Sequence, residues 1–267
     1  MDSTLADVPA RLRPTLRTLL TSSADDERIR SVWLEGSLAR GIADDWSDLD
    51  LHLAVLDPES FAATGWLESQ MHLVLSDAIP GVTGAFICLT SDWIHIDLNV
   101  HSSQSEFPLG ATRRVLLDRD NQVQSAELAP SSPGQPFFPA QDVQIFLYFL
   151  GQSVASVWRG DLIAQSQATS MLRDRLLINL LLAENGIRSD MISKRIGGHL
   201  SVEQMHCLTS IPAFGLSELS LRNAQQCIAS AYLGRARKLS ETCEAPWPTE
   251  LEQATKELLN RELQMTW

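Results

Sequence analysis

The chain has 267 residues, 44% of them apolar, and a formal net charge of -12. This length allows one large domain or two ordinary ones, and the apolar fraction is high enough for a buried core, which indicates a globular protein. The sequence contains no run of about 18 apolar residues, and its N-terminus lacks the basic start and apolar middle of a signal peptide, so we expect a cytoplasmic protein that makes no membrane contact.

The first 125 residues alternate between helix-like and strand-like segments. Residues 5–22 carry apolar side chains at helical spacing, and 58–79 begins with a proline suited to a first helical turn, so both segments predict helices. Strands are predicted where β-branched and aromatic residues are enriched or where apolar and polar residues alternate. These strands are expected at 31–36, 48–56, 82–89, 93–101 and 115–123.

A proline-rich segment follows and separates two regions of different character. We predict a linker at 126–140, because four prolines fall between 130 and 139. Beyond it the pattern is almost wholly helical, with one apolar stripe per segment and a capping-box sequence at Ser201–Gln204. The sequence therefore predicts an α+β protein with a first domain at 1–125 and a bundle of four to six helices at 141–267.

The stretch GSLARGIADDWSDLD, residues 36–50, concentrates polar groups around a predicted strand. Side chains alternate between the faces of a strand, so Asp48, Asp50 and His52 share one face while leucines occupy the other. Two carboxylates two positions apart are separated by roughly 6 to 7 Å. That spacing lets both lean onto metal ions held about 3.5 to 4 Å apart.

The strand predicted at 93–101 shows the same division and supplies a third carboxylate, Asp97. If the two strands are neighbours, Asp97 lies beside Asp48 and Asp50. Three oxygen ligands of this kind suit Mg²⁺ or Mn²⁺, and a nucleoside triphosphate would complete the coordination shell.

The residues just upstream are suited to phosphate. Gly36 allows close approach of the backbone, and Ser37 offers an N–H and a hydroxyl at the end of the preceding strand. Arg40 adds a guanidinium group that can grip phosphate oxygens. Each feature alone is common in ordinary turns, but their combination at this spacing is far more specific.

This pattern resembles the DNA polymerase beta-like nucleotidyltransferase superfamily, in particular the small bacterial branch that includes the aminoglycoside and lincosamide nucleotidyltransferases. The resemblance is carried by Gly36-Ser37, then Asp48-x-Asp50 on a strand and Asp97 on a later strand. It implies a mixed sheet flanked by helices, with a helical bundle as the second domain. The motif match covers roughly residues 30 to 100.

The same resemblance implies a chemistry and assigns roles to residues. Two divalent ions, Mg²⁺ or Mn²⁺, would be held by Asp48, Asp50 and Asp97 as the catalytic residues, and Asp97 is also the candidate general base. A nucleoside monophosphate, AMP from ATP as the first choice, would pass to an acceptor hydroxyl with release of pyrophosphate. The nucleotide-binding residues expected from the motif are Gly36, Ser37, Arg40 and Ser47.

Other polar and aromatic residues have two interpretations each. His52, His95 and His101 either move protons and contact the substrate or lie at the surface. Glu35 either orients Arg40, faces the acceptor or simply ends a strand. The tryptophans of the first half can stack on a base or a sugar, although core packing is the safer interpretation for each of them: Trp33, Trp46, Trp66 and Trp93.

The charge distribution bears on the acceptor. Residues 1–125 hold 19 Asp and Glu against 9 Lys and Arg. Such an acidic surface opposes nucleic acid and is compatible with a small cationic acceptor such as an aminoglycoside, while a lincosamide stays open. The four cysteines lie far apart, which argues against a zinc ribbon, an iron–sulfur site or a disulfide framework.

Two alternatives from other classes stay open. One is a toxin-like nucleotidyltransferase that modifies a protein or tRNA, and the other is a non-catalytic nucleotide-binding regulator. The clustered carboxylates argue against the second, because they repel one another when no metal neutralises them. We expect a monomer or a homodimer.

Overall fold

The structure is a computed structural model that describes residues 5–107, 112–125, 134–189 and 194–267. Its contacts divide the chain into two compact units, Met1–Pro130 and Ser131–Trp267, each with its own hydrophobic core. Most of the linker predicted at 126–140 lies outside the described residues, so its limits and those of the flanking domains stay a prediction. None of the described helices is both long and apolar enough to cross a membrane.

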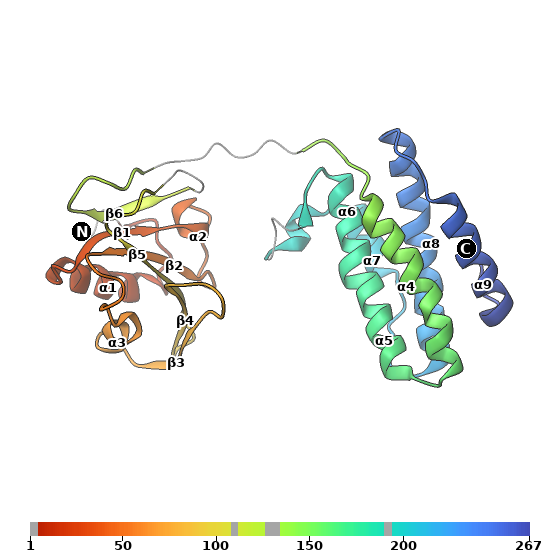
Figure 1. The fold of residues 1–267 in the computed structure, drawn as a ribbon, viewed down its shortest axis with the longest axis horizontal. Helices are drawn as coiled ribbons and strands as arrows, with labels where there is room; N and C mark the ends of the chain where they lie inside the picture. Colours follow the sequence, from red (N-terminus) through yellow and green to blue (C-terminus); the bar gives the residue numbers. More distant parts are fainter. Residues whose placement is uncertain (1–4, 108–111, 126–133, 190–193) are drawn as a thin grey trace. The chain divides into compact units, whose positions relative to one another are not determined.

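The first unit contains a six-stranded mixed sheet with the order β3-β4-β5-β2-β1-β6 (Figure 1). Neighbouring strands are antiparallel except for the central pair β2 and β5, which run parallel. The strands are β1 (Ile29–Leu34), β2 (Leu49–Val55), β3 (Leu73–Ala78), β4 (Ala85–Thr90), β5 (His95–Ser102) and β6 (Arg114–Asp118). This mixed sheet and the helical unit that follows confirm the predicted fold class.

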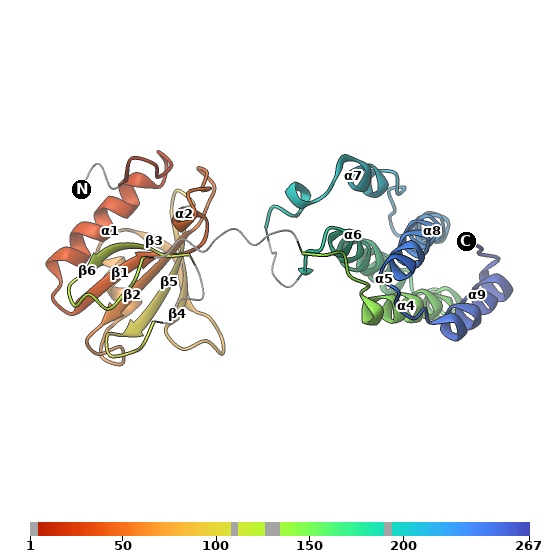
Figure 2. The ribbon, with the colours of Figure 1, turned by 90° about the horizontal axis from the view of Figure 1, so that it is seen from above.

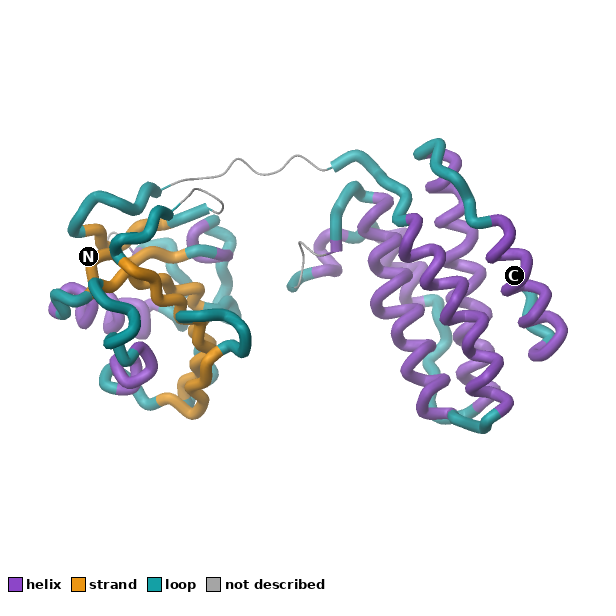
Figure 3. Tube along the Cα trace, viewed as in Figure 1, coloured by secondary structure: helices purple, strands orange, loops and turns teal. Residues whose placement is uncertain are grey.

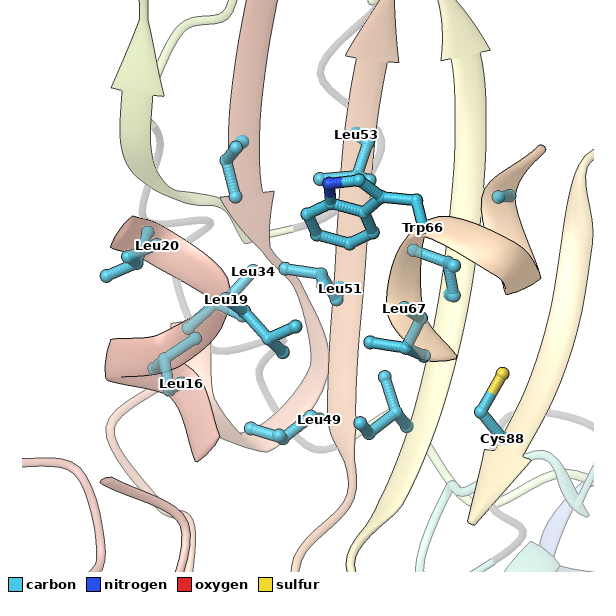
Figure 4. Close-up of a cluster of buried hydrophobic side chains, with 14 of the residues drawn as sticks. Leu16, Leu19, Leu20, Leu34, Leu49, Leu51, Leu53, Trp66, Leu67 and Cys88 are labelled. Carbon is cyan, nitrogen blue, oxygen red and sulfur yellow. The ribbon is translucent and has the colours of Figure 1, made fainter. Parts of the chain in front are cut away.

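One face of this sheet packs on helices, and the sequence explains which face. Leu49, Leu51 and Leu53 alternate along β2 and are fully buried. They pack against leucines of α1 (Arg13–Asp25) and against α3 (Ala63–Glu68), both of which lie on the same side of the strands in Figure 4. The opposite face of β2 therefore carries Asp50 and His52.

Two predicted helices differ from the structure. In the segment 58–79 a helix forms only at α3, in the first half, and the prediction is wrong over the second half, where the edge strand β3 forms instead. The apolar spacing of these residues fits a helix. They form a strand instead because they pair with β4, for example Ala78 with Phe86, and long-range strand pairing outweighs local propensity. The helix predicted at 5–22 begins only at Arg13, with Pro14 in its first turn, and it continues to Asp25.

The second unit is helical, as predicted, and Figure 3 shows its described elements as helices joined by loops. Ser201 caps α7 and forms the expected capping box with Gln204. Figure 2 shows the same helices from above. They are α4 (Ala140–Trp158), α5 (Leu162–Met171), a π-helical segment (Leu172–Leu177), α6 (Ile178–Glu184), a 3-10 turn (Ile196–His199), α7 (Val202–Thr209), α8 (Glu218–Thr242) and α9 (Thr249–Leu263).

Tyr232 places a polar group in the core of this unit at a high energetic cost. Tyr232 of α8 is fully buried and stacks on Phe146 of α4 with ring centroids 3.7 Å apart. Its hydroxyl oxygen has no hydrogen-bond partner among the described residues, and burial raises the pKa of the phenol. A buried hydroxyl without a partner loses its bonds to water and gains none in return.

We therefore expect Tyr232→Phe to stabilise the protein by about 1 kcal/mol, because the substitution removes the unpaired hydroxyl and keeps the ring. Chemical denaturation of the full chain measures the change. Tyr148→Phe is the matched control, since Tyr148 is 55% exposed and its substitution should leave stability unchanged. A destabilised Tyr232→Phe variant would show that the hydroxyl has a partner after all.

Candidate active site

Strand directions bring the polar segments of the first unit to one edge of the sheet. Because β2 and β5 are parallel, their first residues meet at the same edge, and Asp50 lies directly opposite Asp97. β1 is antiparallel to β2, so the end of β1 reaches this edge as well, and the Glu35 N–H donates to the Asp50 carbonyl at 3.1 Å. The two carboxylate-bearing strands are therefore neighbours, which is the condition under which the sequence places Asp97 beside Asp48 and Asp50.

A group of potential metal ligands lies at this edge. The imidazole of His95 stands between two carboxylates, with Nδ1 3.2 Å from Asp48 and Nε2 3.0 Å from Asp97. One potential ligand atom from each of the three residues lies within 4.8 Å of the others. His95 Nε2 is buried, and despite its closeness to Asp97 it makes no hydrogen bond of acceptable geometry among the described residues.

Asp50 is beside this group but is oriented differently. A Cβ atom added to Gly36 would stand 1.9 Å from Asp50 Oδ2, so the carboxylate is packed against the glycine turn. Burial raises the pKa of Asp50, and the nearby charges of Asp97 and Glu35 raise it further. The structure thus gathers Asp48 and Asp97 around His95, and it places Asp50 between that group and Gly36.

The residues predicted to hold phosphate follow β1. Gly36 has φ +62° and opens the short helix α2 (Gly36–Ala39), where Ser37 is half-buried. Arg40 Nε donates to the Gly36 carbonyl at 3.1 Å, which keeps its guanidinium group beside the turn. Ser47 lies in the following loop, where its hydroxyl accepts from the Asp44 N–H at 2.9 Å.

Sequence reasoning did not foresee an organised polar network on the same face of the sheet. Glu35 accepts hydrogen bonds from Trp33 at 3.1 Å and from Arg113 at 3.0 Å. His52 and His101 stack in parallel, with Nδ1 of the first 3.0 Å from Nε2 of the second, and Trp33 stacks on both rings. Only the alternation that places His52 and Asp50 on one face pointed towards this network.

The titration of the network follows from its burial. Burial lowers the pKa of His52 to about 4 and also lowers that of His101, so both rings are neutral near pH 7. Burial also opposes ionisation of Glu35, but the hydrogen bond from Trp33, the charge that His52 gains when it is protonated in acid, and the contacts with Arg113 together lower its pKa. The carboxylate therefore carries a charge beside neutral imidazoles.

The tryptophans divide into buried and exposed pairs. Trp33 and Trp66 are buried, as the interpretation as core residues predicts. That interpretation is wrong for Trp46 and Trp93, which are 80% and 72% exposed. Both lie in loops next to the candidate metal ligands.

Comparison with known proteins gives the following findings. A family model described as streptomycin adenylyltransferase matches residues 12–261. Among solved structures, the crystal structure of an aminoglycoside 6-adenyltransferase from Bacillus subtilis is 19% identical, and the match covers 91% of this chain and 95% of that one with a TM-score of 0.41. No curated protein matches the chain.

The close contact between Gly36 and Asp50 predicts that alanine costs more stability at Gly36 than at Gly41. Gly41→Ala should cost about 1 kcal/mol of stability, because φ is +67° there but no atom lies within 4 Å of the added Cβ. Gly36→Ala should cost clearly more, because the same strain is joined by a collision with the Asp50 carboxylate. Denaturant unfolding of both variants measures the difference, and equal losses would contradict the close packing of Asp50.

The histidine pair predicts a loss of stability in acid. The folded-state pKa of His52 is depressed to about 4, whereas that of the unfolded chain is about 6.5, so the unfolded state takes up protons first as the pH falls. The free energy of unfolding should therefore fall between about pH 6.5 and about pH 4, by roughly 3 kcal/mol for His52 alone.

Denaturant unfolding with a chelator present, repeated at several pH values in this window, tests the prediction. His52→Gln should flatten the acid limb of the curve, whereas substitution of the exposed His72 by glutamine should leave its shape unchanged. The same acid limb in wild type and His52→Gln would mean that other groups cause it.

Proposed function

Because the chain belongs to the streptomycin adenylyltransferase family, and is thus a nucleotidyltransferase, we propose that it transfers AMP from ATP to a hydroxyl group of an aminoglycoside antibiotic. The family match extends over residues 12–261 and so includes both compact units. The observation that carries the proposal is the meeting of Asp48 and Asp97 at one edge of the sheet, next to the turn at Gly36. Family membership and this edge together favour phosphoryl chemistry that depends on a divalent cation.

The residues at the edge fit a divalent cation such as Mg²⁺ or Mn²⁺. Three observations support this fit: a buried His95 nitrogen that has no hydrogen bond among the described residues, the Asp48 and Asp97 carboxylates on either side of the imidazole, and an Asp50 whose ionisation is opposed by its neighbours. We propose Asp48, Asp50 and Asp97 as ligands of two ions, with His95 adjoining them. The oxygen donors favour Mg²⁺, and the imidazole nitrogen makes Mn²⁺ equally suitable.

Bound divalent ions would stabilise negative charge on the phosphates and lower the pKa of the acceptor hydroxyl. The chain itself supplies orientation. The Gly36–Ser37 turn presents an N–H and a hydroxyl for the β- and γ-phosphates, and Arg40 adds positive charge beside the turn. Ser47, on the other side of the loop, is the fourth proposed nucleotide contact.

The proposed general base is Asp97. It lies on β5 opposite Asp50 and is only partly buried, with 28% of its side chain exposed, so that an acceptor can reach it. The acceptor hydroxyl would give its proton to this carboxylate as its oxygen bonds to the α-phosphorus. The bond from that phosphorus to the bridging oxygen breaks at the same time, and pyrophosphate leaves.

The test is pyrophosphate release from ATP and Mg²⁺ with streptomycin, other aminoglycosides, a lincosamide or no acceptor. We expect release that depends on an aminoglycoside, stops on addition of EDTA and returns with excess Mg²⁺ or Mn²⁺. Asp48→Asn should lower the rate by at least about a hundredfold, because it weakens the charge that holds the cation.

Asp25→Asn is the matched control, since Asp25 is an exposed aspartate that precedes β1, at the end opposite the Gly36 turn. Its activity should equal that of the wild type. Full activity of Asp48→Asn would remove Asp48 from the metal site. Release without any aminoglycoside, or with a protein or tRNA acceptor alone, would contradict the proposed acceptor.

A further inference from the structure

Two exposed tryptophans flank the candidate metal ligands. Trp46 comes two residues before Asp48, and Trp93 comes two residues before His95. Large apolar side chains at such exposure lose the benefit of burial, and a pair of them in adjacent loops marks a contact surface. Trp93 also has φ +63°, a backbone conformation that non-glycine residues rarely adopt and that is concentrated at functional sites.

The Arg11 side chain donates hydrogen bonds to the backbone of both loops. Its Nη2 donates to the carbonyl oxygens of Asp92 at 2.6 Å and Trp93 at 3.1 Å, and its Nη1 donates to the carbonyl oxygen of Asp45 at 3.0 Å. The guanidinium carbon stands 4.3 Å from the ring centroid of Trp46. One side chain thus fixes the backbone of both loops and covers one face of the Trp46 ring.

We propose that Trp46 and Trp93 form an aromatic platform for the cationic part of the acceptor. The inference rests on the function proposed above and names a subsite for its second substrate. Arg11 already shows that a planar cation packs on Trp46, and the indole ring is the best aromatic partner for a cation. An aminoglycoside presents both ammonium or guanidinium groups and apolar sugar faces to such a surface.

The negative charge of the two loops suits a cationic acceptor. Loops 40–48 and 91–94 carry four carboxylates, Asp44, Asp45, Asp48 and Asp92, against one cation of their own, Arg40, and the Arg11 side chain that contacts both loops. This balance attracts a cation to the exposed rings. A neutral nucleobase would gain stacking from the rings but nothing from the carboxylates.

The order of groups along the edge of the sheet also indicates that the acceptor approaches near Trp93. The Gly36 turn follows β1, the carboxylates stand on β2 and β5, and Trp93 precedes β5 on the side of β4. In-line transfer requires the acceptor to approach opposite the leaving pyrophosphate. With pyrophosphate at the Gly36 turn, the acceptor side is the side of Trp93.

The experiment compares steady-state kinetics of the wild type and of the double variant Trp46→Ala/Trp93→Ala, with streptomycin and ATP varied in turn. We expect the KM for streptomycin to rise about tenfold or more, while the KM for ATP stays within about twofold. Trp46→Phe/Trp93→Phe should recover most of the loss, because a smaller aromatic ring still offers its face. Thermal unfolding of each variant checks that it is folded.

Leu56→Ala is the matched control, since Leu56 is 55% exposed and follows β2 at the end opposite Asp50. It should leave both KM values unchanged. A rise in the KM for ATP alone would show that the platform receives the nucleobase and would overturn the inference. Unchanged values for both substrates in the alanine variant would overturn it as well.

Calorimetric titration of streptomycin without ATP separates this inference from the proposed function. If the wild type binds streptomycin but releases no pyrophosphate, the proposed transfer fails, and loss of binding in the double alanine variant still supports the platform. If the wild type transfers AMP to streptomycin and the double variant binds it equally well, the platform fails and the function stands. A wild type that does not bind streptomycin overturns the platform.

Discussion

The candidate site depends on the parallel pairing of β2 with β5. This single register places Asp50 opposite Asp97 and brings Asp48 within reach of His95, although nearly fifty residues separate the two segments in sequence. An antiparallel pairing would move the β5 residues to the other end of β2. A slip by one residue would turn the carboxylates into the leucine core. The register of the sheet therefore determines the arrangement of the candidate site as well as that of the core.

Burial of the leucine face of the sheet compensates for the stability that its polar face costs. Leu49, Leu51 and Leu53 are buried under α1 and α3, which secures the strands from one side only. The other side contains carboxylates that oppose one another's ionisation and two histidines that burial keeps neutral. Such groups reduce stability, and they persist because the apolar face compensates for them.

Much of the candidate site could be predicted from the sequence, and the features that could not be predicted have physical causes. Alternation along 48–56 and 93–101 predicts which side chains share a face, since it depends only on strand geometry. The pairing that turns part of 58–79 into a strand involves residues distant along the chain, and local spacing does not report it. The packing of Asp50 on Gly36 and the exposure of Trp46 depend on loop conformation, which periodicity does not encode.

The position of Arg11 extends the site beyond the sheet. This residue precedes α1, yet it fixes the loops that lead into β2 and β5. Domain boundaries drawn at the first regular helix would discard it together with its contacts to both loops. For protein engineering, residues 5–12 belong with the first unit, and a shortened version or a swapped N-terminus has to preserve them.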